Sequence, residues 1–455
     1  MDSEYKEPEI DATSGKQHTN NSIQGNNDHD ENFIDVSQVD DEILELIQLT
    51  IDQDTISDRT IAILENVKTF TFQKPFIFPE NFNNSNLITV FCRLLDCVGI
   101  LSELSIIILG NIWLEIEVKS HELFFEDELI DSVLNVFYHA EIPLKIHTLR
   151  ALSNCFKTSQ RVAEYALNQP DFIQLTGELL SIDHYSLRNE LLDMLSIISK
   201  FGNPEILQPF FEPLLDMISI NYPKPSSFAA MFVNTMVKKD ISLARNTEDF
   251  LLRLLNGMKL GYTDTLVTCI DTICAIIQSI KNSFKDSSQK ISDYVDFSPL
   301  FSEQFMKYIN TAISRKLIED STEIYNLLAN LSPEIDETCW EFGLIEETFD
   351  NMEGVSSRNK IIILSYLCTY FKNSPNERRE EMALRLFGEL LQVIENVDDS
   401  QTVLFLQTMI NINPDNRIED FSDEWLEILD SFCDNDNEAI SIMAQQYLQQ
   451  LEEQN

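Results

Sequence analysis

Apolar side chains recur every three or four positions along most of this chain. Two such runs are Ile130, Val133, Leu134 and Phe137, and Leu187, Leu191, Met194, Leu195 and Ile198. This spacing places the apolar side chains on one face of an α-helix. The strict apolar–polar alternation of a β-strand is rare. The pattern therefore predicts an all-α protein from about residue 41 to residue 455.

A short sequence frame recurs near the ends of these apolar helices: an apolar residue, any residue, then asparagine. Six of its occurrences, spaced along the chain, are Leu64–Asn66, Leu109–Asn111, Leu152–Asn154, Phe232–Asn234, Leu328–Asn330 and Met409–Asn411. Four similar helices without the asparagine fill the gaps, and their corresponding positions are Ile197, Ala275, Tyr366 and Gln450. These ten frame positions are about 43 residues apart on average. Such a period is typical of HEAT and armadillo repeats, at roughly 40–47 residues.

The predicted repeat contains two helices. In several repeats a helix with a Leu-Leu pair comes first, as in 171–181, 208–218 and 382–394, and a polar turn such as 182–186 follows it. The helix that carries the frame position, here called the frame helix, comes next. Such a helix pair cannot bury its apolar faces alone, so neighbouring pairs stack on one another. The expected result is a superhelical solenoid whose frame helices line a concave surface.

Two of the frames resemble a known family. The segments Ile108–Ile112 and Arg150–Cys155 resemble the third helix of armadillo repeats, and they are most similar to the importin-α nuclear transport adaptors, which have ten repeats of similar length. The resemblance covers about residues 45–455 as an architecture and is most specific at 109–111, 152–154 and 328–330. It implies a right-handed armadillo/HEAT-type superhelix of about ten repeats.

The resemblance also implies a peptide-binding groove. In the family, the frame asparagines hold the backbone of an extended cargo peptide, since an amide offers both a donor and an acceptor. By resemblance, the peptide-binding residues here are Asn66, Asn111, Asn154, Asn330 and Asn411. We also expect Asp193 and Asp271 to lie on the concave face and to attract basic side chains of a partner. The asparagines could equally be structural, by bonding to nearby backbone.

The chain departs from the family pattern at the aromatic positions. A tryptophan one turn before each frame position would hold a lysine or arginine side chain by a cation–π contact. The residues at those places are Ala62, Ile107, Arg150, Asp193, Ala230, Asp271, Asn326, Ile362, Gln407 and Gln446. The three tryptophans of the chain are Trp113, Trp340 and Trp425.

The composition narrows the classes of function. The chain has 455 residues, with 76 Asp and Glu against 32 Lys and Arg, a formal net charge of −44. Such a charge disfavours binding to nucleic acid or to an anionic membrane, and it also disfavours self-association, so we expect a monomer. Only 11 residues are glycine, which leaves few positions for a glycine-rich phosphate-binding loop.

Cysteine use and apolar segments bear on the compartment. Eight cysteines occur without a CxxC pair, so buried free thiols are expected and a zinc site is not. The first ten residues lack the apolar stretch of a signal peptide. The longest mainly apolar stretches, 104–114 and 361–371, are too short to cross a bilayer. These features predict a cytoplasmic and/or nuclear protein.

Three segments differ from the regular repeat pattern. Residues 1–40 hold ten acidic residues and two lysines, with few apolar residues, and predict a disordered acidic tail ahead of a repeat domain at 41–455. The polar stretch Lys281–Asp293 predicts an exposed loop. From Asp415 to Asn455 the acidic residues are interspersed with apolar ones at helical spacing, which predicts an amphipathic helix.

No recognisable catalytic motif or cofactor-binding motif occurs, and the six histidines are scattered. We therefore predict a non-enzymatic protein-binding adaptor without a cofactor. It would hold extended or basic segments of partner proteins, as an importin-α-like import adaptor does. The alternative is an armadillo scaffold or regulatory subunit of a complex unrelated to transport. A chaperone for histones or other basic proteins, acting through its acidic segments, is a third hypothesis.

Overall fold

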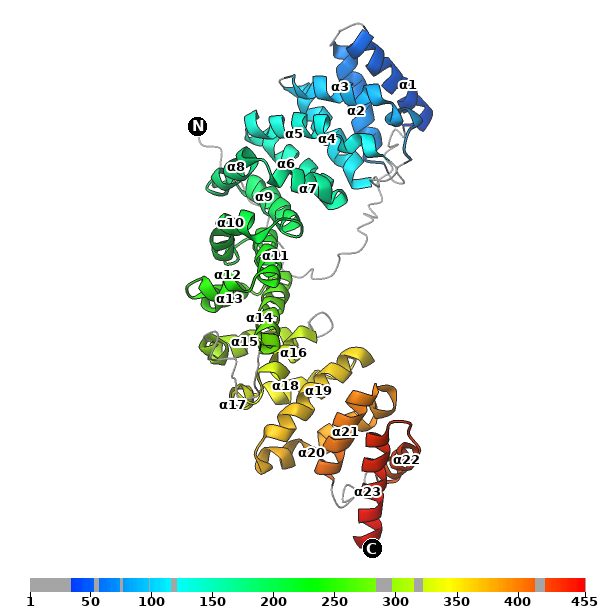
Figure 1. Cartoon of the computed structure of the whole chain (residues 1–455), viewed down its shortest axis with the longest axis vertical. Helices are drawn as coiled ribbons and strands as arrows, with labels where there is room; N and C mark the ends of the chain where they lie inside the picture. The colour runs from blue at the N-terminus through cyan, green and yellow to red at the C-terminus, as the bar shows by residue number, and fades with distance from the viewer. Residues whose placement is uncertain are drawn as a thin grey trace, which may run out of the picture. The chain divides into compact units, whose positions relative to one another are not determined.

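The computed structural model describes residues 34–52, 57–73, 77–97, 99–115, 121–283, 297–314, 322–413 and 422–454. Within these ranges the secondary structure is helical and no β-strand occurs, which confirms the predicted all-α class. The chain divides into two compact units, 1–194 and 195–455, and the division falls inside α9 (Tyr185–Ile198). Each unit is described by itself below (Figure 1).

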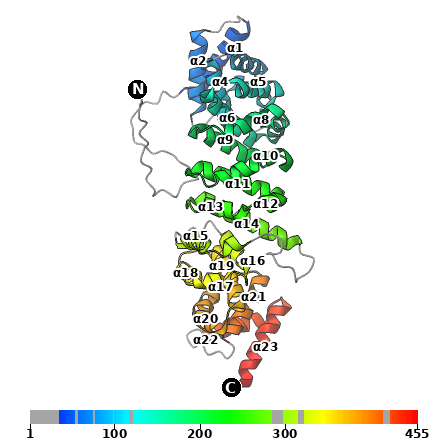
Figure 2. The ribbon, with the colours of Figure 1, turned by 90° about the vertical axis from the view of Figure 1, so that its left-hand side faces the viewer.

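The helices of the first unit before α9 are α1 (Val36–Ile47), α2 (Asp58–Thr71), α3 (Ser85–Leu95), α4 (Ile100–Glu115), α5 (Asp127–His139), α6 (Ile142–Thr158), α7 (Gln160–Leu167) and α8 (Pro170–Leu180). A π-helical turn covers Gln48–Asp52, and 3-10 turns cover Glu80–Asn83 and Glu122–Phe125. The helices form two layers, because α2, α4 and α6 pack side by side in sequence while α3, α5 and α8 do the same. Figure 2 shows α2, α4 and α6 on one side of this unit and α5 and α8 on the other.

The helices of the second unit after α9 are α10 (Pro204–Met217), α11 (Pro223–Lys239), α12 (Ser242–Asn246), α13 (Phe250–Met258), α14 (Thr263–Ser283), α15 (Glu303–Ser314), α16 (Thr322–Leu331), α17 (Asp336–Glu341), α18 (Leu344–Asp350), α19 (Ser357–Asn373), α20 (Asn376–Leu391), α21 (Asp399–Ile412), α22 (Ser422–Cys433) and α23 (Glu438–Gln454). Two 3-10 turns cover Ser298–Phe301 and Ile394–Asn396. Helices α11, α14, α16, α19, α21 and α23 pack consecutively, each on the next. Helix α10 packs on α13, and α15 packs on α18.

All ten frame positions lie within helices, and these are α2, α4, α6, α9, α11, α14, α16, α19, α21 and α23. We call these ten helices the frame layer. Its members are the helices that pack consecutively within each unit, and α9 is joined to α6 by the ion pairs described below. The chain is therefore an all-helical protein of stacked helices, as the apolar spacing predicted.

Two of the three tryptophans lie in the protein core. Trp113 and Trp425 are fully buried, and the indole Nε1 of Trp113 donates a hydrogen bond of 2.9 Å to the backbone carbonyl of Phe124. Trp340 is half-buried, and the Arg378 guanidinium lies 5.0 Å from its ring centroid. The Trp340 indole therefore contacts an arginine of its own chain.

Three predicted segment boundaries change. Helix α1 begins at Val36, so the predicted acidic tail at 1–40 extends too far: the Asp35 carboxylate accepts a hydrogen bond from the Ser37 amide, and Val39 is fully buried. Residues 1–33 lie outside the described part. Helix α14 continues to Ser283, into the predicted loop 281–293, and 284–296 lie outside the described part. The predicted C-terminal amphipathic helix is two helices, α22 and α23.

The burial of the cysteines and of the apolar helix α14 is typical of a protein core. All eight cysteines are free thiols, five of them buried and three half-buried. Burial raises the pKa of Cys339 and Cys368 to about 12. Among the described residues, the stretch Thr263–Asn282 of α14 is long and apolar enough to cross a membrane, with a mean hydropathy of 1.3, but 56% of it is buried against other helices. A buried core helix passes the same test.

Candidate protein-binding face

On the frame helix α6, a row of polar side chains is at least partly exposed. On α6, Arg150 and Lys157 are exposed, and His147 and Asn154 are half-buried. In chain order these four side chains are spaced by three, four and three positions, so they lie on one side of the helix. We call this side of the frame helices the frame face.

The frame asparagines of the first unit bind neighbouring helices. The side-chain nitrogen of Asn66 donates to the Glu42 carboxylate on α1, at 2.9 Å. The nitrogen of Asn111 donates to the Thr71 hydroxyl on α2, at 2.9 Å, and that of Asn154 donates to the Gly110 carbonyl on α4, at 2.9 Å. The bonds of Asn111 and Asn154 link a frame helix to the frame helix before it, and that of Asn66 links α2 to α1. All three asparagines are half-buried, so their remaining polar atoms lie at the edge of the frame face.

In the second unit, Asn234 is bonded to the frame helix that follows its own. The nitrogen of Asn234 on α11 donates to the Asp271 carboxylate on α14, at 2.9 Å. The side-chain oxygen of Asn234 is buried without a hydrogen-bond partner. Asn411 lies on α21 and is exposed. Asn330 lies on α16, and its side chain is outside the described part.

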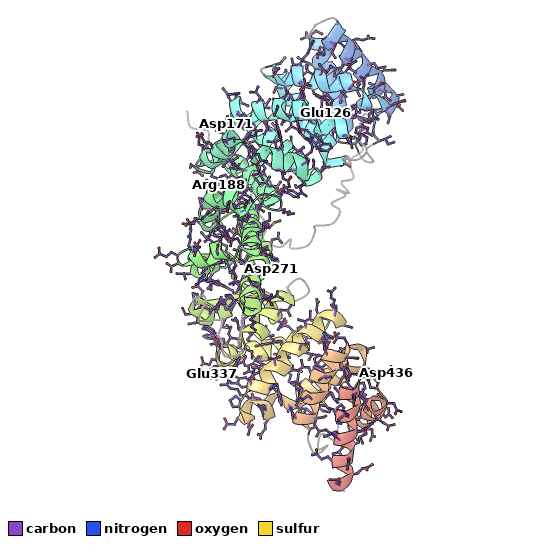
Figure 3. All side chains as sticks on the ribbon, viewed as in Figure 1. Glu126, Asp171, Arg188, Asp271, Glu337 and Asp436 are labelled. Atoms are coloured by element: carbon purple, nitrogen blue, oxygen red, sulfur yellow. The ribbon has the colours of Figure 1, made fainter. Side chains whose placement is uncertain are left out.

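The two predicted aspartates already have basic partners within the chain. The carboxylate of Asp193 on α9 lies 3.3 Å from the Lys157 ammonium on α6, and that of Asp271 lies 2.5 Å from the Lys238 ammonium on α11. Figure 3 labels Asp271 on α14. Each carboxylate thus pairs with a lysine of the preceding frame helix, and the attraction of a partner protein's basic side chains stays a prediction.

Arg150 belongs to the same set of contacts. Its guanidinium lies 2.7 Å from the Glu190 carboxylate on α9, and this hydrogen bond raises the pKa of Arg150. From the sequence, Arg150 was noted as one of the residues that stand where the family has tryptophan, and its acid was not identified. A signal was present: the lysine or arginine and its acid are 33 to 40 residues apart in all three pairs, about one repeat.

The acidic charge of the protein is not on the frame layer. The ten frame helices contain 13 acidic and 13 basic residues, counting Asp, Glu, Lys and Arg. The other α-helices contain 28 acidic and 8 basic residues. The face that the sequence predicted to be acidic is thus carried by helices without net formal charge.

Close helix packing explains the glycine of the Leu109–Asn111 frame. A Cβ atom built on Gly110 would lie 3.1 Å from the Cβ of Ala151 on α6. Glycine and alanine therefore allow α4 and α6 to approach closely, and this brings the Gly110 carbonyl within reach of Asn154. In the described part of the chain, no group of three or more His, Cys, Asp or Glu side chains could hold a metal ion.

Comparisons with known proteins bear on the fold alone. No family model and no curated protein matches this chain. Among solved structures, it is similar to the crystal structure of an engineered protein, Northeast Structural Genomics Consortium target OR497, with a TM-score of 0.66 and 13% identity over 90% of this chain and 99% of the other. A second engineered protein, target OR366, covers 51% of this chain and 98% of its own, at 14% identity and a TM-score of 0.42. The first likeness supports the arrangement of stacked helices.

Proposed function

We propose that this protein is a non-enzymatic adaptor that holds extended segments of partner proteins along its frame face. The observation that carries the proposal is the position of the frame asparagines. Asn66, Asn111 and Asn154 are half-buried on the consecutive frame helices α2, α4 and α6. The side-chain nitrogen of each donates one hydrogen bond within the chain. A primary amide has a second N–H and a carbonyl oxygen, which can pair with a peptide backbone. In this proposal the frame layer lines the concave side of a right-handed armadillo-type superhelix of about ten repeats.

The charge balance of the frame layer favours a scaffold or regulatory subunit over an import adaptor. A groove for lysine-rich cargo needs open carboxylates, and the Asp193 and Asp271 carboxylates are paired with lysines. A partner segment without a high positive charge suits such a surface better. The proposal includes protein partners, a monomeric state, no cofactor and a cytoplasmic and/or nuclear location.

An importin-α-like adaptor is the second candidate, and the asparagine spacing supports it. The two candidates differ in the cargo that they accept. A lysine-rich nuclear-localisation peptide, labelled with fluorescein, is titrated with the full chain at low salt and at about 0.15 M salt. Micromolar binding that persists at the higher salt would favour the import adaptor. Loss of binding at the higher salt would contradict that candidate and leave the scaffold.

A matched pair of variants tests the frame face itself. The double variant Asn111→Ala/Asn154→Ala removes two frame asparagines, and the control Asn168→Ala/Asn256→Ala removes two exposed asparagines outside the frame layer. We expect any peptide that binds the frame face to lose at least tenfold in affinity in the first variant and less than twofold in the control. Equal effects would contradict the proposed face. Thermal unfolding of both variants identifies a loss that arises from unfolding.

A further inference from the structure

A cavity of about 350 Å³ lies between α10 and α12, both outside the frame layer. Figure 1 shows these two helices next to each other in the second unit. Its walls include Glu205, Gln208, Pro209 and Phe211 of α10, and Leu243 of α12. This volume is enough for one long side chain, and the cavity is separate from the frame asparagines.

The cavity is lined by negative charge. Glu205, Glu212 and Asp240 contribute to its walls, and its lining includes no lysine or arginine. Two of these acids have contacts within the chain: the Asp240 carboxylate accepts a hydrogen bond from the Ser242 amide at 2.9 Å, and the Glu212 carboxylate lies 3.8 Å from the Arg253 guanidinium. Glu205 is exposed at the start of α10. The lining therefore retains unneutralised carboxylate charge.

The prolines of α10 add hydrogen-bond acceptors to this wall. Pro209 and Pro213 lie inside the helix and have no amide hydrogen. The carbonyl oxygens four residues earlier, those of Glu205 and Pro209, therefore lack the usual helical donor. Both of these residues line the cavity. Two residues of the lining thus carry backbone acceptors that the helix does not use, which suits a ligand with several N–H groups.

The lining of the cavity also includes apolar residues. Phe211 and Leu243 are buried side chains that contribute to the lining, and the ring of Pro209 is exposed beside them. An apolar wall beside carboxylates suits a side chain with an aliphatic stem and a cationic end, which is the structure of arginine and lysine. Arginine offers five N–H donors in a planar fork.

We propose that this cavity receives an arginine or lysine side chain of a partner protein. The guanidinium or ammonium group would pair with Glu205 and Glu212, while the stem contacts Phe211 and Leu243. The charge complementarity selects a basic segment as the occupant. The acidic helices outside the frame layer would attract such a segment at long range, and the cavity would fix one of its side chains.

The probe for this site is a fluorescein-labelled hexa-arginine peptide, titrated by anisotropy at about 0.15 M salt against the full chain. The variant Glu205→Gln/Glu212→Gln removes two cavity charges. The control Asp171→Asn/Glu178→Gln removes two charges from α8, which belongs to the other unit (Figure 3 labels Asp171). We expect the cavity variant to raise the Kd at least fivefold and the control to change it less than twofold. Equal changes in both would overturn the proposal, since general attraction would then explain the binding.

A second variant tests the shape of the site without changing the charge. Gln208 is exposed and lines the cavity, so Gln208→Trp fills the space with little effect on the core. We expect it to raise the Kd at least fivefold as well, and an unchanged Kd would overturn the proposal. Competition with arginine methyl ester distinguishes the source of the cation. Displacement of the peptide by low-millimolar ester would point to a free small cation and overturn the partner-protein assignment. The frame asparagines are unchanged in every variant, so failure here leaves the proposed function intact.

Discussion

The side-chain nitrogen of Asn154 donates a 2.9 Å hydrogen bond to the backbone carbonyl of Gly110, on the frame helix before it. The two residues belong to successive frames, Gly110 at the second position and Asn154 at the third, and they are 44 positions apart. The bond is possible because Gly110 lacks a Cβ, which lets α6 approach at Ala151. One repeat is thus fixed to the next by the same residues that the frame motif contains.

Replacement of Asn154 by alanine should destabilise the first unit. The variant loses one half-buried hydrogen bond between α4 and α6, and such bonds contribute about 1 kcal/mol each. We expect the free energy of unfolding to fall by roughly that amount in urea titrations followed by circular dichroism. Asn168→Ala, an exposed asparagine after α7, is the control and should change little. A loss no larger than that of the control would mean that the bond contributes nothing.

Two glycine-to-alanine changes should differ in how they change the free energy of unfolding. In both, alanine favours the helix by up to about 1 kcal/mol, so the difference reports packing. The new Cβ at Gly110 would meet the Ala151 Cβ at 3.1 Å, whereas that at Gly257 would meet the Ile218 Cγ2 at 2.1 Å. We expect Gly257→Ala to destabilise by about 1–3 kcal/mol and Gly110→Ala by less. The order is checked by thermal melts of both variants, and the reverse order would contradict it.

Asp336 should make stability depend on pH. Its carboxyl is buried, one oxygen accepts a hydrogen bond of 2.8 Å from the Ser332 hydroxyl, and the other has no hydrogen-bond partner. Burial raises the pKa of Asp336 above its usual value of 3.8. The folded chain therefore holds this proton more tightly than the unfolded chain. Its contribution to the free energy of unfolding falls as the pH rises from about 3.8 through the raised pKa.

The variant Asp336→Asn removes this dependence while keeping an oxygen for Ser332. We expect it to be more stable than the wild type at neutral pH, by an amount on the order of 1 kcal/mol, because an unpaired buried charge is removed. The gain should shrink as the pH is lowered toward 4. The measurement is the urea midpoint of both proteins across that range. A gain that grows on acidification would contradict the sign.

Lys238 should limit the access of basic segments to Asp271. Its ammonium lies 2.5 Å from that carboxylate, and both side chains are partly exposed. Lys238→Met should leave stability within about 1 kcal/mol, because exposed ion pairs contribute little. It should raise the affinity for a lysine-rich peptide two- to fivefold, measured by anisotropy at low salt.

The matched control for this change is Lys307→Met, which removes the same charge from α15, outside the frame layer. Its affinity for the peptide should stay within about 1.5-fold of the wild type at low salt. If both variants gain equally, the effect is one of net charge and the frame face is not involved.

The sequence predicted the helices well because their determinants are local. The frame positions lie in runs of apolar residues at helical spacing, and all ten are found in helices. The start of α1 was placed five residues late, because its cap, Asp35, is itself acidic and is easily grouped with the acidic residues before it.

The face was predicted less well because its chemistry depends on pairs from different repeats. The sequence gives Asp193 and Asp271 as acids on a face, but whether each is neutralised depends on how the preceding helix is rotated. The position of Trp113 likewise depends on the folded structure. Its indole donates a hydrogen bond to the carbonyl of Phe124, eleven positions later, and that contact requires the chain to fold back. The cavity beside α10 likewise forms only when α12 packs near it.

The hydrogen bonds between frame helices have a consequence for how the chain unfolds. They join residues 37 to 44 positions apart, so each closes a short loop and depends only on the adjacent repeat. Stability then propagates from neighbour to neighbour and can be lost in the same way. Amide hydrogens of α23, which packs on α21 and α22, should exchange with solvent sooner than those of α14, which packs on α11, α13 and α16.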